Sequence, residues 1–294
     1  MFENPTSGDL FSEELGNPTL EETRFAIVDV ETTGLDSHDR VLEVACLITK
    51  GPLEREEFCR LVNPQTPIPQ EVVTIHGIKE EAVREAPFFS SIAPELTTLL
   101  KGAVLVAHNA PFDISFLTRE WKLLGGRMPT MKVVDTLTLA RNLIDLDRYS
   151  LDYLADALSL PNRPAHRALA DVKTTHNLLW YLIERAPERP KRLNDLLRLL
   201  DPPDISWERA EEEGAIRPAL EPLKEALSAG RPIRIAYLAR NGETIVIVTP
   251  LKLERTGRRI FLRVRLSGDR AVRSFRLDRI TSIFPSGHND ASDS

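Results

Sequence analysis

A short apolar run that ends in two acidic residues constrains this chain more than any other feature. The run is FAIVDVE at residues 25–31, and the turn-forming segment Thr32-Thr33-Gly34 follows it. Its length and its β-branched residues favour a buried strand. Because side chains alternate across a strand, Asp29 and Glu31 point to the same face, with their Cα atoms about 7 Å apart.

Two carboxylates on one partly shielded face repel each other unless a proton or a cation lies between them. Oxygen ligands of this kind suit Mg²⁺ or Mn²⁺. A strand end that simply reaches solvent is the alternative, and Asp29 and Glu31 alone do not decide between the two interpretations.

The composition indicates a soluble, globular protein of two domains. Of 294 residues, 42% are hydrophobic and 28% are charged, which is enough to form a sizeable core. No 18 uncharged apolar residues run together, and the polar, acidic start lacks the layout of a secretory signal, so we expect a cytoplasmic protein with no membrane segment. Cys46 and Cys59 fit neither a disulfide framework nor clustered zinc ligands.

The pattern over residues 23–185 predicts one α/β domain with a mixed sheet. After the first strand, residues 41–50 and 56–62 continue as an antiparallel meander. Strands and helices then alternate. We expect strands at 103–107 and 133–135, and helices at 92–100, 111–124, 137–144, 150–157 and 168–185.

A different pattern begins after a Pro-rich, acidic segment at residues 186–217, which we interpret as a linker with a short helix at 193–200. A helix is predicted at 218–227, and short strands follow, so residues 218–284 form a small barrel-like β domain. The strands are expected at 233–238, 244–249, 260–266 and 271–275. Residues 1–22 are interpreted as a flexible arm and 285–294 as a tail.

Charge is divided unevenly between these parts. The net charge is −6, yet residues 231–283 hold thirteen basic and four acidic residues, a net of +9, so the remainder carries −15. The overall acidity argues against a protein built only to coat nucleic acid. Either two modules with their own surface charges are joined, or both parts share an anionic partner.

Two further segments hold candidate functional residues. In HNAPFD at residues 108–113, Asp113 falls in the first turn of a helix, where an acidic residue is also favoured by the helix dipole alone. In HRALAD at residues 166–171, His166 lies in a Pro-flanked loop and Asp171 lies near the start of the last helix of the domain. An exposed histidine of this kind is commonly without function, so only the combination of motifs is informative.

The segments DVETTG, HNAPFD and HRALAD, in this order, resemble the three motifs of the DnaQ-like DEDDh exonucleases, the family of the proofreading epsilon subunit of bacterial DNA polymerase III. The resemblance covers residues 23–185. It implies a ribonuclease H-like fold with a five-stranded mixed sheet, and removal of nucleoside 5′-monophosphates from 3′ ends. His166, five residues before Asp171, marks the histidine branch of that family.

The resemblance also implies a role for each motif residue. Asp29, Glu31, Asp113 and Asp171 would ligate two divalent metal ions, Mg²⁺ or Mn²⁺. His166 would accept the proton of the attacking water, a task that suits an unperturbed imidazole pKa of about 6.5.

Four more residues are candidates for contacts with the terminal nucleotide: Thr32, Thr33, His76 and Asn109. For the two threonines the alternative is an ordinary turn, and for Asn109 it is a helix cap.

The second part resembles the WYL domain, a small Sm-like β-barrel found in bacterial regulators, from about Pro218 to Ile283. The tripeptide that names that family falls here at Ile260-Phe261-Leu262, which keeps only the leucine. The resemblance implies binding of nucleic acid or a nucleotide-like ligand. Candidates for phosphate contacts are Arg263, Arg265, Arg273, Arg276 and Arg279, although arginines that alternate along strands also describe a solvated face.

The sequence therefore predicts a metal-dependent 3′-to-5′ exonuclease that acts on single-stranded DNA, with the basic domain as substrate holder or sensor. An exonuclease for RNA or short oligoribonucleotides with the same chemistry is the nearest alternative. A catalytically silent nucleic-acid-binding regulator is the alternative of another class, and the intact carboxylates and His166 weigh against it. Neither a polymerase partner nor an oligomeric state follows from the sequence.

Overall fold

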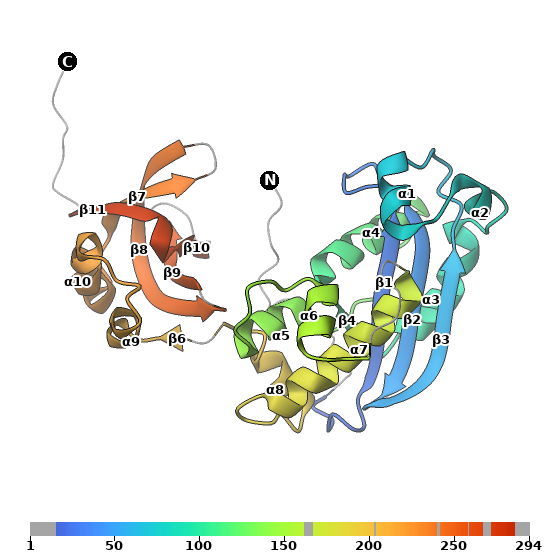
Figure 1. Cartoon of the computed structure of the whole chain (residues 1–294), viewed down its shortest axis with the longest axis horizontal. Helices are drawn as coiled ribbons and strands as arrows, with labels where there is room; N and C mark the ends of the chain where they lie inside the picture. The colour runs from blue at the N-terminus through green and yellow to red at the C-terminus, as the bar shows by residue number, and fades with distance from the viewer. Residues whose placement is uncertain are drawn as a thin grey trace, which may run out of the picture. The chain divides into compact units, whose positions relative to one another are not determined.

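The computed structural model describes residues 16–161, 167–202, 204–239, 242–257, 259–266 and 272–285. The chain divides into two units, one of residues 1–143 and 147–200 and the other of residues 144–146 and 201–294. Each unit has its own sheet (Figure 1). None of the described helices combines the length and the apolar character that crossing a membrane requires.

The first unit contains a five-stranded mixed sheet in the order β3-β2-β1-β4-β5. The β1–β2 and β2–β3 pairs are antiparallel, and the β1–β4 and β4–β5 pairs are parallel. The strands are β1 (Arg24–Thr32), β2 (Val41–Lys50), β3 (Leu53–Leu61), β4 (Val104–Ala107) and β5 (Val133–Asp135). The apolar run at 25–31 is thus the central strand, which explains why residues 25–28 are at most 1% exposed.

Helices cover both faces of this sheet. Even-numbered β1 residues such as Ala26 and Val28 pack in one core with α3 and α4, whereas Phe25 makes an edge contact with Trp180 of α7 on the other face (Figure 1). The helices are α1 (Gln70–His76), α2 (Glu80–Arg84), α3 (Phe89–Leu100), α4 (Ala110–Leu123), α5 (Thr136–Leu143), α6 (Leu151–Ala157), α7 (Ala168–Arg185) and α8 (Leu193–Arg198). The predicted ribonuclease H-like α/β architecture is confirmed.

The second unit is an antiparallel sheet in the order β10-β9-β8-β7-β11, with β6 paired to β8. The strands are β6 (Asp204–Ile205), β7 (Ile233–Ala239), β8 (Gly242–Thr256), β9 (Arg259–Leu266), β10 (Val272–Arg276) and β11 (Ile280–Pro285). Two helices, α9 (Trp207–Glu212) and α10 (Glu221–Ala229), contribute Trp207 and Leu223 to its core. Between the described residues of β10 and β11 no pairing occurs, so closure into a barrel stays a prediction.

The structure differs from the sequence-based expectation at two connecting segments. Residues 186–217, interpreted as a linker, are divided between the units. The expected short helix is α8 in the first unit, whereas β6 and α9, which were not predicted, belong to the second. The described part of the expected arm is attached to the first unit, because Leu20 is only 4% exposed and its N–H donates to the Lys191 carbonyl at 2.9 Å. Burial of Leu20 accounts for this attachment.

Candidate metal centre

Three of the predicted carboxylates converge at the C-terminal end of the central strand β1. Asp29 and Glu31 come from β1 and Asp171 from the first turn of α7, and one carboxylate oxygen of each lies within 4.8 Å of the others. Alternation along β1 directs Asp29 and Glu31 to the face that α7 covers. Asp171 is 9% exposed, and Asp29 and Glu31 are half-buried, so the group is partly shielded from water.

Asp113 lies next to this group, but its carboxylate oxygens are not among those that lie within 4.8 Å of one another. Its side chain is 2% exposed, and Oδ1 accepts a hydrogen bond from the backbone N–H of Val30 at 3.1 Å. Val30 stands between Asp29 and Glu31, so this bond ties the start of α4 to the acidic end of β1.

Burial and repulsion by neighbouring carboxylates raise the pKa values of Asp29, Glu31 and Asp113. Burial, and then the charges of Asp113, Asp171 and Glu31, raise the pKa of Asp29 well above its usual range. Burial raises the pKa of Glu31 to about 7 and that of Asp113 to about 8. Such a set gains from a bound cation, which favours the ionised form of every carboxylate around it. The all-oxygen donor set fits Mg²⁺ or Mn²⁺.

Asp135, which belongs to none of the three sequence motifs, fixes the start of α4. Its Oδ1 accepts from the backbone N–H groups of Asn109, Ala110 and Leu137 at 2.9, 3.3 and 3.1 Å. Asn109 holds a left-handed backbone with φ of 71°, and its side chain makes no capping hydrogen bond. Asn109 therefore stands at the N-cap position of α4, but the carboxylate of Asp135 accepts the hydrogen bonds there in place of the Asn109 side chain. A contact of Asn109 with the terminal nucleotide stays a prediction.

The hydroxyl groups of Thr32 and Thr33, which follow the two acids of β1, form hydrogen bonds within residues 32–40. The Thr32 hydroxyl donates to the Gly34 carbonyl at 2.6 Å. The Thr33 hydroxyl donates to Asp39 Oδ1 at 3.0 Å and accepts from the Arg40 N–H at 3.0 Å. The structure therefore supports the turn interpretation for these side chains.

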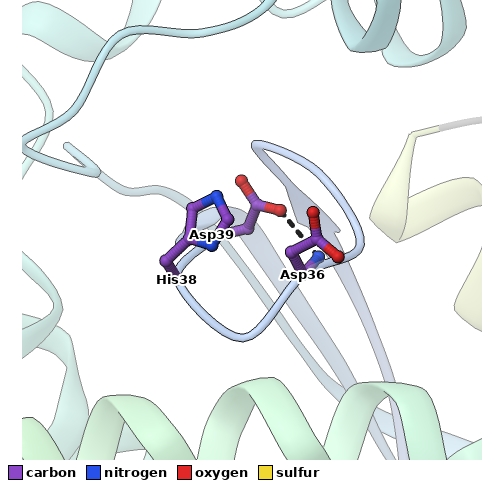
Figure 2. Close-up of side chains that lie close together, drawn as sticks. All are labelled: Asp36, His38 and Asp39. Carbon is purple, nitrogen blue, oxygen red and sulfur yellow. Dashed lines mark hydrogen bonds between the residues drawn. The ribbon is translucent and has the colours of Figure 1, made fainter.

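The same loop carries a second group of possible ligands, Asp36, His38 and Asp39 (Figure 2). Asp39 Oδ2 accepts from the Asp36 N–H at 2.7 Å, so Asp39 closes the loop from within. A Cβ at Gly34 would lie 2.4 Å from Asp39 Oδ2, which explains the glycine. These bonds give the group a structural role.

The remaining predicted residues of the first unit have different outcomes. His76 is 5% exposed, and its Nδ1 accepts from the Ile78 N–H at 3.0 Å, so this ring nitrogen is used within the α1–α2 turn. His166 lies outside the described residues, which resume at Arg167. Its assignment as general base stays a prediction.

The five arginines of the second unit do not form one stripe. Arg273 pairs directly with Val264 of β9, whereas Arg276 pairs with Phe261, so Arg273 and Arg276 lie on opposite faces. Arg276 contacts Asp278 at 2.5 Å and Arg263 contacts Glu254 at 3.5 Å. Within the described part of the chain, neither Arg265 nor Arg279 has an ion pair.

Comparisons with known proteins add to this geometry. The family model described as Exonuclease, of RNase T type, matches residues 26–179, and the WYL domain model matches residues 218–285. Over 169 residues the chain is 38% identical to a PolC-type DNA polymerase III of Caldanaerobacter subterraneus subsp. tengcongensis, which covers 57% of this chain and 12% of that protein. Over 168 residues it is 33% identical to the DNA polymerase III subunit epsilon of Pasteurella multocida, which covers 53% of this chain and 66% of that protein.

A solved structure of E. coli exonuclease I in complex with a dA16 oligonucleotide is also similar. It has a TM-score of 0.54 and 17% identity, over 82% of this chain and 55% of the other. At that identity the similarity concerns the fold.

Proposed function

This chain belongs to the RNase T/DnaQ-like family of 3′-to-5′ exonucleases, which are hydrolases, and on that premise we propose that it removes nucleoside 5′-monophosphates from the 3′ end of single-stranded DNA. The observation that carries this proposal is the convergence of Asp29, Glu31 and Asp171 within 4.8 Å, with Asp113 buried beside them. These residues lie far apart in the sequence, and the fold brings their carboxylates together.

The proposed chemistry divides between these four carboxylates and His166. Asp29, Glu31, Asp113 and Asp171 would hold two divalent cations, which neutralise phosphate charge and supply a nucleophile near pH 7 when bound. Shielding from water strengthens the electrostatic interactions of these residues. His166 accepts the proton of the attacking water. Its sequence neighbour Arg167 is fixed by an ion pair to Glu43, with a distance of 2.7 Å.

DNA is the proposed substrate because relatives of this chain include a PolC-type DNA polymerase III and a DNA polymerase III subunit epsilon. RNA is the alternative, since the hydrolytic chemistry is the same for both. In the second unit, we propose that the WYL domain holds nucleic acid or a regulatory ligand, with exposed Arg265 as the leading contact.

The test is to incubate 5′-labelled single-stranded DNA and RNA of equal sequence with Mg²⁺, Mn²⁺ or EDTA and to resolve the products by size. We expect a ladder that shortens by one nucleotide from the 3′ end of DNA, and no products in EDTA. Asp29→Ala should reduce the rate by at least about 10³-fold, since it removes a ligand of the cations that supply the nucleophile.

The matched control is Glu95→Ala, which removes an acid of α3 whose side chain is 52% exposed and should leave the rate unchanged. Internal cuts, or activity that survives chelation, would reject the mechanism. A ladder from RNA alone would change the substrate and keep the chemistry.

A further inference from the structure

Glu43 is a buried acid of β2 that none of the motifs includes. Its side chain is 1% exposed and accepts from Arg167 at two points, Nη2 at 2.7 Å and Nε at 3.2 Å. Its Oε2 also accepts from the backbone N–H of Ala168 at 3.0 Å. Because Ala168 is the first residue of α7, one carboxylate fixes both the start of that helix and the residue before it.

The place of Glu43 in the sheet brings it beside the candidate metal centre. In the β1–β2 register, Glu43 lies directly opposite Glu31. Like charges at directly opposite positions of antiparallel strands repel each other. Arg167 is the cation that acts on both: it pairs with Glu43, and its charge lowers the pKa of Glu31. The guanidinium thus has two carboxylates nearby, and it forms its ion pair with Glu43.

We propose that Glu43 is a positioning residue for the metal centre, which keeps the Arg167 guanidinium on itself and away from Glu31 while it fixes the helix turn that carries Asp171. This inference rests on the proposed function, because it treats Glu31 and Asp171 as cation ligands. Without the Glu43 charge, Arg167 would turn to the opposing carboxylate of Glu31 and compete there with a divalent cation.

The test measures Mn²⁺ affinity by electron paramagnetic resonance on the full chain in the absence of nucleic acid. Glu43→Gln keeps the side-chain size and removes the charge. We expect its Mn²⁺ affinity to fall about 10- to 100-fold, the usual effect of removing a residue that orients metal ligands. The double variant Glu43→Gln/Arg167→Gln removes the competing cation as well, so it should recover most of the lost affinity.

Glu120→Gln is the matched control. Glu120 is 2% exposed and, like Glu43, accepts two hydrogen bonds from one arginine, here Arg40, and one from a backbone N–H. It should lower the melting temperature in EDTA as Glu43→Gln does and leave Mn²⁺ affinity unchanged. Wild-type affinity in Glu43→Gln, an equal loss in Glu120→Gln, or a double variant weaker than the single one would overturn the proposal.

The inference and the proposed function fail in different ways. Wild-type protein that binds Mn²⁺ but releases no nucleotides would reject the nuclease and leave the role of Glu43 testable by affinity. An active wild-type protein with unchanged affinity in Glu43→Gln would reject the positioning role alone. Wild-type protein that binds no Mn²⁺ would reject both.

Discussion

At the scale of single residues, Glu31 is a carboxyl group whose ionisation falls within the physiological pH range. Burial, together with the charges of Asp171 and Glu43, raises its pKa from 4.5 to about 7. A group with a raised pKa binds more protons in the folded than in the unfolded chain, so its ionisation destabilises the fold as pH rises from about 4.5 to about 7. The whole shift corresponds to roughly 3 kcal/mol.

We predict that the metal-free protein loses thermal stability across this pH window, because Glu31 must then ionise among other acids. Scanning calorimetry in EDTA should show a larger fall in melting temperature for wild type than for Glu31→Gln, which cannot ionise. Addition of Mn²⁺ should remove most of the difference between low and high pH, since a bound cation favours the ionised carboxylates. A wild-type curve parallel to that of Glu31→Gln would show that the buried acid carries no such penalty.

The four carboxylates could be predicted from the sequence because each lies in a short motif with a readable local context. Asp29 and Glu31 end an apolar strand, and Asp113 and Asp171 each fall in the first turn of a helix. Glu43 could not be predicted, since its role depends on the register of β1 with β2 and on where α7 begins.

At the scale of secondary structure elements, Asp135 joins the end of β5 to the start of α4. Asp135→Ala removes the acceptor for three backbone N–H groups, and we expect it to cost about 1 to 3 kcal/mol in the free energy of unfolding. It should also lower the rate of the proposed nuclease reaction, because the helix turn that carries Asp113 would lose these hydrogen bonds. Urea unfolding and the ladder assay measure the two effects. Asp135→Asn retains an acceptor oxygen, so an equal loss for both variants would contradict this explanation.

Most strands and the longer helices were predicted to within a few residues, whereas the short helices α1, α2 and α9 were not predicted. In α4, Pro111 is the second residue and Gly125 lies two residues beyond the last one, as helix start and stop signals predict. β8 was expected to end at Thr249 but continues to Thr256, because an irregularity between Pro250 and Lys252 accommodates the proline without ending the ladder. β11 was not predicted, since its place in the sheet depends on pairing with distant β7.

At the scale of the whole molecule, the net charge of each part shows that the second part is basic, but it does not show where that part binds an anion. Residues 231–283 carry a net of +9, yet Arg263 and Arg276 are paired with Glu254 and Asp278. A count of arginines therefore overstates the charge available to a phosphate backbone. The sequence showed the basic character of this region, but the ion pairs depend on the fold.

We predict that Arg265→Ala weakens binding of single-stranded DNA in EDTA and reduces the slope of log affinity against log salt concentration by about 0.7, the value for one phosphate contact. Fluorescence anisotropy at several salt concentrations measures both quantities. Arg209→Ala, which removes an arginine already paired with Glu213 at 3.0 Å, is the control and should leave the slope unchanged. An unchanged slope for Arg265→Ala would exclude that residue as a phosphate contact.

The hydrogen bond between Asp113 and the Val30 N–H fixes the position of β1 relative to α4, and this position limits which sequence changes the strand can tolerate. A shift of β1 by one position would turn Val28 and Val30 toward α7 and bury Asp29 and Glu31 among apolar side chains. Inserting or deleting one codon in that strand should therefore abolish the proposed hydrolysis. The outer strand β3, with most of its side chains exposed, can accumulate substitutions at little cost.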